Sequence, residues 1–167
     1  LRLRHYTSRL DQVHSCLVSS DVDRAFFMKH RIARRVFVAP NVVEAPATKP
    51  VCRADNPPTL LFCGTLNYRP NVEGIEAFVG RVFPRLRAAL PNLRLHIVGR
   101  DPAPGLLALG RDPMISISSN VASVAPYYRS ATVAIVPLIS GTGTRVKILE
   151  AFAQGCPVVT TKIGGEG

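Results

Sequence analysis

The sequence predicts an α/β protein, with a Rossmann-like parallel sheet that has helices on both faces. Two observations predict this fold class. Apolar strand-like runs alternate with segments of helical periodicity from residue 58 to residue 167. The last part of the chain also reads as strand, glycine loop, helix and strand, a unit that joins parallel strands.

Composition divides the chain into three expected parts. Residues 1–40 are expected to be the remnant of a preceding domain, and residues 58–167 to be the main α/β domain, truncated at its end. Residues 41–57 are expected to be a linker, because the stretch around them is rich in proline and has no helical periodicity. The chain has no initiator Met and stops directly after a strand-like run, so we expect a piece of a longer protein.

The first part has the pattern of a small α/β unit. We expect a helix over residues 4–15, a short strand over 16–20, a second helix over 21–31 and a strand over 36–39. Ser20 or Asp21 is expected to cap the second helix, whose first turn carries negative charge.

The second part continues the alternation. Strands are expected over residues 59–64, 93–99 and 114–118, and a short helix over residues 122–131. Residues 66–71 are expected to form a loop, and residues 100–112 to hold at most a short helix. Residues 72–90 are expected to form one amphipathic helix, with an inner side made of Ile75, Phe78, Val79, Val82, Phe83 and Leu86.

The end of the chain predicts a phosphate site. A strand over residues 133–138 leads into a loop with two glycines, a helix that starts near residues 142–144, and a strand over residues 157–161. Such a loop presents backbone N–H groups and a helix dipole to an anion, which suggests a nucleotide or nucleotide-sugar site. Arg145 and Lys147 lie two residues apart, so we expect one of them to be a solvated surface charge.

The charge and the cysteines limit the partner classes. The net charge is +10, from 21 Lys and Arg against 11 Asp and Glu. It would suit a nucleic acid, an anionic membrane surface or a phosphorylated substrate. The one dense basic cluster, residues 31–35, has no interleaved aromatics, so no nucleic acid is expected. The four cysteines show no metal-ligand spacing, so no metal is expected. We expect a reduced, cytoplasmic setting.

The segment PL-x2-G-x-G-T-R-x-K-x-L-E-A-x-A-x-G-x-P-V-V-x-T, closing on IGGEG, resembles the donor-binding half of family 4 glycosyltransferases, which have the two-domain GT-B fold. LLFCGTLNYRPNVEGIEAF, LRLHIVGR and SSNVASVAPYYRSATVAIVPL resemble further segments of that half, in the same order. SSDVDR and VAPNVV resemble the end of the acceptor domain, with Val42 where the family usually has glycine. The resemblance covers roughly residues 15–167 and is nearest to bacterial sugar transferases of surface-polysaccharide assembly.

The resemblance implies a retaining transfer from a nucleotide-diphospho-sugar to a saccharide or lipid-linked acceptor, without a metal or other cofactor. The enzyme would work in the cytoplasm, in peripheral contact with the anionic inner face of the membrane. The catalytic residues would lie upstream of residue 1, and this piece alone would be inactive. The expected donor-binding residues are Gly64, Asn67, Arg69, Asn120, Val121, Gly141, Thr142, Gly143, Thr144, Arg145, Lys147 and Glu150.

Individual roles also follow from the resemblance. The helix start near Thr142 and Thr144 would bind the distal phosphate, aided by Arg145 or Lys147, and Glu150 would accept from the ribose hydroxyls. The family's first E-x7-E glutamate is replaced by Thr142, and its basic pair after the first strand is reduced to Arg69.

Structural alternatives stand beside these roles. Glu150 would otherwise be an exposed helix carboxylate, the two loop glycines a plain turn, and His96 is expected to be structural. The alternative function is a non-catalytic, nucleotide-binding Rossmann-like module. Against it, the third glycine of a dinucleotide fingerprint is missing after Gly143.

Overall fold

The computed structural model describes residues 13–44, 46, 57–141 and 143–166. The chain forms two compact units, one mainly of residues 1–42 and one mainly of residues 43–141 and 145–165. Most of the predicted linker lies outside the described residues, so the predicted domain boundaries stay predictions. No helix in the described ranges has the length and hydropathy that crossing a membrane requires.

The small unit is one β-α-β motif. Strands β1 (Ser15–Val18) and β2 (Arg35–Val38) pair in parallel and are joined by helix α2 (Asp21–Lys29). The hydroxyl oxygen of Ser20 accepts from the backbone N–H of Asp23 at 3.1 Å, so Ser20 is the N-cap. The helix expected over residues 4–15 lies mostly outside the described residues. Its last residue belongs to β1 instead.

The large unit is a five-stranded parallel sheet in the order β5-β4-β3-β6-β7. The strands are β3 (Thr59–Thr65), β4 (Arg94–Arg100), β5 (Ile115–Ser119), β6 (Val133–Val136) and β7 (Val158–Thr160). The helices are α3 (Arg69–Arg81), α4 (Phe83–Ala89), α5 (Pro104–Leu107), α6 (Ala125–Ser130) and α7 (Val146–Ala153), with short 3-10 turns at Ala108–Arg111 and Ile163–Gly165. The predicted fold class is confirmed.

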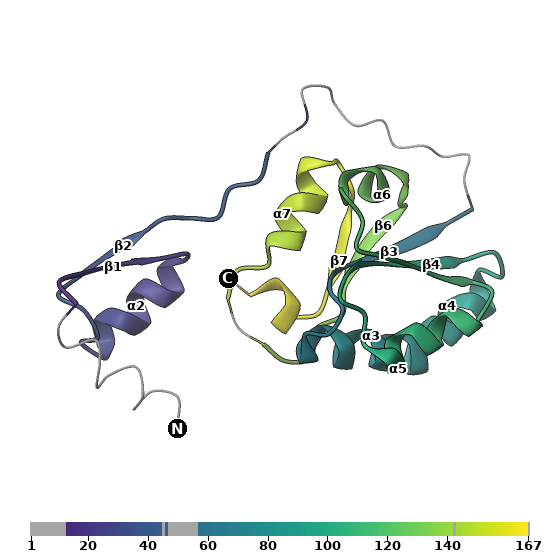
Figure 1. The fold of residues 1–167 in the computed structure, drawn as a ribbon, viewed down its shortest axis with the longest axis horizontal. Helices are drawn as coiled ribbons and strands as arrows, with labels where there is room; N and C mark the ends of the chain where they lie inside the picture. Colours follow the sequence, from purple (N-terminus) through teal and green to yellow (C-terminus); the bar gives the residue numbers. More distant parts are fainter. Residues whose placement is uncertain (1–12, 45, 47–56, 142, 167) are drawn as a thin grey trace. The chain divides into compact units, whose positions relative to one another are not determined.

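Helices cover both faces of this sheet. Helices α3, α4 and α5 lie on one face, and α6 and α7 lie on the other (Figure 1). Two hydrophobic clusters reflect these layers, because successive strand residues point to opposite faces. One cluster contains Phe62, Ile75, Phe83, Leu95 and Ile97. The other contains Leu61, Cys63, Tyr128, Ala151 and Cys156.

The single helix expected over residues 72–90 is wrong in two respects. It is two helices, α3 and α4, and the residue between them, Val82, is 42% exposed rather than on the inner side. Pro84 accounts for the break, because its ring clashes with the carbonyl four residues earlier in a continuous helix. The first helix also begins at Arg69, inside the predicted loop, with Pro70 in its first turn, where a missing N–H is tolerated.

Candidate functional site

The candidate site lies where the strand order reverses. The chain moves from β3 outward through β4 to β5 and then returns to β6 on the other side of β3. The crevice beyond the carboxyl ends of two such strands is the usual ligand site in an open α/β sheet. Here the segments at that edge are the loop and first turn of α3 after β3, and the glycine loop after β6.

Close packing joins these two segments. A Cβ added to Gly74 of α3 would lie 2.7 Å from the carbonyl oxygen of Pro137, so only glycine allows this approach of helix to strand end. A Cβ on Gly141 would lie 3.5 Å from Cβ of Pro70. The hydroxyl of Ser140 lies 3.5 Å from the carboxylate of Glu73. The first turns of α3 therefore form one wall beside the glycine loop.

The loop before α7 has the backbone of a turn that only glycine adopts readily. Gly141 has a φ of +106° and Gly143 a φ of +89°. Thr144 follows, half-buried, and Thr142 lies outside the described residues. The helix begins at Val146, later than predicted, with Arg145 as its N-cap. Its first turn has no acidic residue and no side-chain cap, so its dipole is available to an anion.

Lys147 points across the carboxyl end of β3. Its ammonium donates to the side-chain oxygen of Asn71 at 2.9 Å and lies 4.5 Å from the ring centre of Phe62. A Cβ on Gly64 would be 2.9 Å from that ammonium, so glycine at the end of β3 makes room for it. Burial, with a smaller contribution from nearby Arg145, lowers the pKa of Lys147 to about 8.

The expectation that either Arg145 or Lys147 is solvated is wrong. Both side chains are at least half-buried, because Arg145 precedes the helix and the rule for helix faces does not apply to it. Its guanidinium donates to the carbonyl oxygens of Gly141 at 2.9 Å and Ile163 at 3.4 Å. Arg145 thus ties the glycine loop to the turn after β7, while Lys147 faces β3.

Glu150 lies one turn after Lys147 on the same helix face. It is half-buried, and its carboxylate lies 3.3 Å from the hydroxyl of Tyr128, which also lies 3.1 Å from the backbone carbonyl oxygen of Lys147. The exposed-carboxylate alternative for Glu150 is therefore not what the structure shows. Burial raises the pKa of Cys63 to about 12, so this neighbouring thiol is protonated and neutral.

Of the other predicted residues, two are exposed and two follow a different strand. Asn67 is exposed, and the side chain of Arg69 is 87% exposed and paired with Glu73 at 2.7 Å. Asn120 and Val121 follow β5, two strands away from β3, which is a separation of roughly 10 Å. The structure thus brings together Gly64, Lys147 and Glu150, with Gly141 and Arg145 in the adjoining loop.

Two residues of the cluster were not predicted from the sequence. Asn71 holds Lys147, and Tyr128 contacts Glu150. Asn71 lies within the predicted loop, where an asparagine is common, and Tyr128 lies in a short helix that reads as core. Neither position carries a sequence signal, because each role depends on a residue far along the chain.

In the described ranges, the other polar groups do not form a competing site. His96 shares a hydrogen bond of 2.8 Å with the hydroxyl of Ser118, and burial lowers the pKa of His96. The ring of Tyr127 packs edge-on against it at 5.0 Å between centres. Within the described residues no three His, Cys, Asp or Glu side chains are grouped to hold a metal ion.

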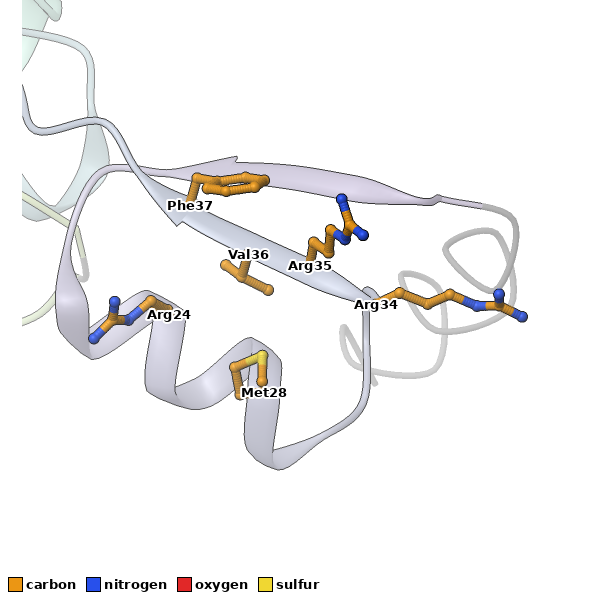
Figure 2. A pocket seen from close by; sticks show the side chains of 6 residues that line it. All are labelled: Arg24, Met28, Arg34, Arg35, Val36 and Phe37. Atoms are coloured by element: carbon orange, nitrogen blue, oxygen red, sulfur yellow. The ribbon is translucent and has the colours of Figure 1, made fainter.

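A hollow of about 650 Å³ in the small unit is also a poor site. It is lined by Arg24, Met28, Arg34, Arg35, Val36 and Phe37. Figure 2 shows Met28 and Val36 between α2 and β2, whereas Arg34 points away from them and Arg35 extends from the other side of β2. Arg24 is paired with Asp21 at 3.0 Å. The arginines therefore do not converge on one anion.

Comparisons with known proteins find a matching family and similar folds. The sequence model of the family described as glycosyl transferases group 1 matches residues 57–167, which is more than half of the chain. A search of curated protein sequences finds no match.

Solved structures share the fold. The chain is similar to the pneumococcal O-GlcNAc transferase GtfA in complex with UDP and GlcNAc, with 17% identity, a TM-score of 0.66, and coverage of 96% of this chain and 32% of that one. It is similar to a mutant of S. aureus TarM in complex with fondaparinux, alpha-GlcNAc-glycerol and UDP, with 10% identity, a TM-score of 0.78, and coverage of 98% and 33%.

A third similar structure is WaaG, a glycosyltransferase involved in lipopolysaccharide biosynthesis, with 22% identity, a TM-score of 0.61, and coverage of 88% of this chain and 44% of that one. At such identities the likeness shows the fold, here that of the Rossmann-like halves of GT-B proteins. The chain spans about a third of the length of GtfA and TarM.

Proposed function

The chain belongs to the group 1 glycosyl transferases, a family of enzymes, and on that premise we propose that its large unit binds the nucleotide-diphospho-sugar donor of a sugar transfer. The observation that carries the proposal is the position of Lys147. Its ammonium lies at the carboxyl end of β3, where the strand order reverses, and Lys147 and Glu150 lie one turn apart on α7. A cation and a carboxylate at that spacing suit the two polar parts of a nucleoside diphosphate.

Each group has a chemical task in this proposal. The start of α7 and Lys147 bind the diphosphate, because an anion is favoured both by free N–H groups and by a positive side chain. Glu150 accepts hydrogen bonds from the two ribose hydroxyls, since a carboxylate has acceptor capacity for both. Arg145 shapes the glycine loop through its bonds to Gly141 and Ile163.

The same groups would assist the reaction itself. Transfer breaks the bond between the anomeric carbon and a phosphate oxygen, and it forms a bond from that carbon to the acceptor oxygen. The proton of the acceptor hydroxyl passes to the leaving diphosphate. The leaving nucleoside diphosphate gains negative charge as the bond breaks. Lys147 and the start of α7 stabilise this charge, which lowers the barrier without a metal ion. We propose that the transfer retains the configuration of the sugar, as the family resemblance implies.

The proposed setting follows from the resemblance and the charge. The acceptor is a saccharide or a lipid-linked saccharide, and the pathway is surface-polysaccharide biosynthesis in the cytoplasm. The net charge of +10 supports peripheral contact with an anionic membrane surface. Neither a metal nor a further cofactor is part of the proposal, and nucleic acid is not a partner.

Thermal shift with UDP, GDP, ADP and their sugars tests the donor site, with UDP first because two of the similar structures contain it. We expect stabilisation by at least one of them. The Glu150→Ala variant should no longer be stabilised by the nucleotide, but it should still be stabilised by inorganic pyrophosphate. The matched control is Glu76→Ala, an exposed glutamate on α3. If no nucleotide or sugar nucleotide stabilises the protein, the proposal is wrong.

A further inference from the structure

A buried amide lies beside the cation of the candidate site. Asn71 is 5% exposed, and no other buried position in the described ranges holds an amide or a charged side chain. Its amide nitrogen donates to the carbonyl oxygen of Thr65 at 2.9 Å, and its oxygen accepts from the ammonium of Lys147 at 2.9 Å. Because the nitrogen faces a carbonyl acceptor, the oxygen has to face Lys147. The amide orientation is therefore determined on both sides.

The chemistry of this contact leaves the lysine charge in place. A carboxylate at the position of the amide would form an ion pair and cancel the charge, whereas an amide oxygen carries only a partial charge. The ring of Phe62, 4.5 Å from the ammonium, also attracts a cation without cancelling it. In the described part of the chain no carboxylate lies within ion-pair distance of Lys147.

The surroundings of the ammonium come from four elements. Asn71 comes from α3, and the neutral thiol of Cys63 comes from β3. Glu150 of α7 favours the charged form of the ammonium, and Arg145 at the start of α7 opposes it. Tyr128 of α6 contacts the backbone carbonyl of Lys147 rather than its ammonium. Burial has the largest effect and lowers the pKa of Lys147 to about 8. A bound diphosphate would raise that pKa, because it adds negative charge beside the ammonium.

We propose that Asn71 is a positioning residue: it holds the ammonium of Lys147 at the carboxyl end of β3 with its positive charge uncancelled, ready for a diphosphate. This inference rests on the proposed function. It adds that the amide, and not a carboxylate or an apolar side chain, is what the anion site requires at this position. Gly64 completes the arrangement, because a side chain there would meet both the amide and the ammonium.

Two variants of Asn71 separate positioning from packing. Asn71→Ala removes the acceptor, and Asn71→Asp keeps the shape but adds the charge that cancels Lys147. Calorimetric titration with UDP and with inorganic pyrophosphate, from pH 6.5 to pH 9.5, measures the affinity of each. The controls are Asn92→Ala and Asn92→Asp, at an exposed turn. Circular dichroism identifies the conditions under which each variant is folded.

We expect the alanine variant to bind about tenfold more weakly, the loss typical of a hydrogen bond to a charged group. The aspartate variant should bind more weakly still, by roughly a hundredfold, because the site loses its net charge. Wild-type affinity should fall above about pH 8, where Lys147 loses its proton. The pH at which affinity falls, called the midpoint below, should be lower in the alanine variant and higher in the aspartate variant. A purely structural asparagine would not move it.

The titration of Lys147 in the ligand-free protein provides a second measurement. Its ε-carbon NMR signal, assigned by its absence in Lys147→Met, should titrate at higher pH in Asn71→Asp than in the wild type. If UDP or pyrophosphate binds and the Asn71 variants keep the wild-type affinity and midpoint, the positioning role is wrong and the donor site stands. If neither ligand binds, the donor site is wrong, and an unchanged Lys147 titration would then also rule out the positioning role.

Discussion

The close approach of α3 to the end of β6 predicts how two glycine-to-alanine substitutions in α3 change stability. Gly74 and Gly80 both lie in α3. A Cβ on Gly74 would be 2.7 Å from the carbonyl oxygen of Pro137 and 3.3 Å from Cα of Leu138, whereas a Cβ on Gly80 would have nothing within 4 Å. The same substitution, glycine to alanine, should therefore have opposite effects at the two positions.

The magnitudes follow from the geometry. Alanine at Gly80 should raise the free energy of unfolding by about 0.5–1 kcal/mol, the usual gain in a helix. Alanine at Gly74 has a similar helical gain. The helix must also retreat by about 0.7 Å to reach an ordinary contact, and overpacking of this kind costs about 1–3 kcal/mol. The difference between the two variants isolates that strain, so Gly74→Ala should be less stable than Gly80→Ala by about 1–3 kcal/mol.

Urea unfolding followed by far-UV circular dichroism measures the difference, and thermal unfolding provides a check at roughly 2–4 °C per kcal/mol for a chain of this size. The comparison is internal, because the two variants share the helix, the added methyl group and the unfolded-state effect. Equal stabilisation by both substitutions would refute the close approach of α3 to Pro137. That result would also contradict the argument that Gly74 lets α3 form a wall of the site.

Three further predictions concern buried side chains. Cys63, with a pKa raised to about 12, should react with iodoacetamide far more slowly at pH 8 than the half-buried Cys16, and equal labelling by mass spectrometry would contradict its burial. Burial lowers the folded-state pKa of His96 below its unfolded value, so the contribution of His96 to stability should be constant above about pH 6.5 and fall below it. Unfolding measured against pH should lose this acid sensitivity in His96→Gln. Tyr128→Phe removes a buried hydroxyl that contacts α7 and should lower the free energy of unfolding by about 1–2 kcal/mol, more than Tyr127→Phe.

Much of the fold was predictable because its signals are local. Apolar runs and glycine loops predict each strand and the turn that follows it, and their alternation predicts a parallel sheet. The errors were local too. The break between α3 and α4 comes from Pro84, and the early start of α3 from Pro70, two prolines whose effects on a helix are opposite.

The site was predictable only in part. The two glycines, Lys147 and Glu150 lie in one motif, so the sequence alone identified them as candidates. The same motif also misled, because the spacing of Arg145 and Lys147 suggested that one side chain would be solvated. Arg145 precedes the helix, so both side chains turn inward. A spacing rule for helix faces holds only where both residues are helical.

The sequence by itself determined the order and type of the elements, the family resemblance and the charged motif of the last strand-loop-helix unit. The tertiary structure decided which partner that motif has. Asn71 and Lys147 are 76 residues apart, and they meet because β6 returns to lie beside β3. The sheet order thus places a neutral amide at the one lysine of the site. No local pattern encodes that contact, since it depends on how the strands are arranged and not on which residues form them.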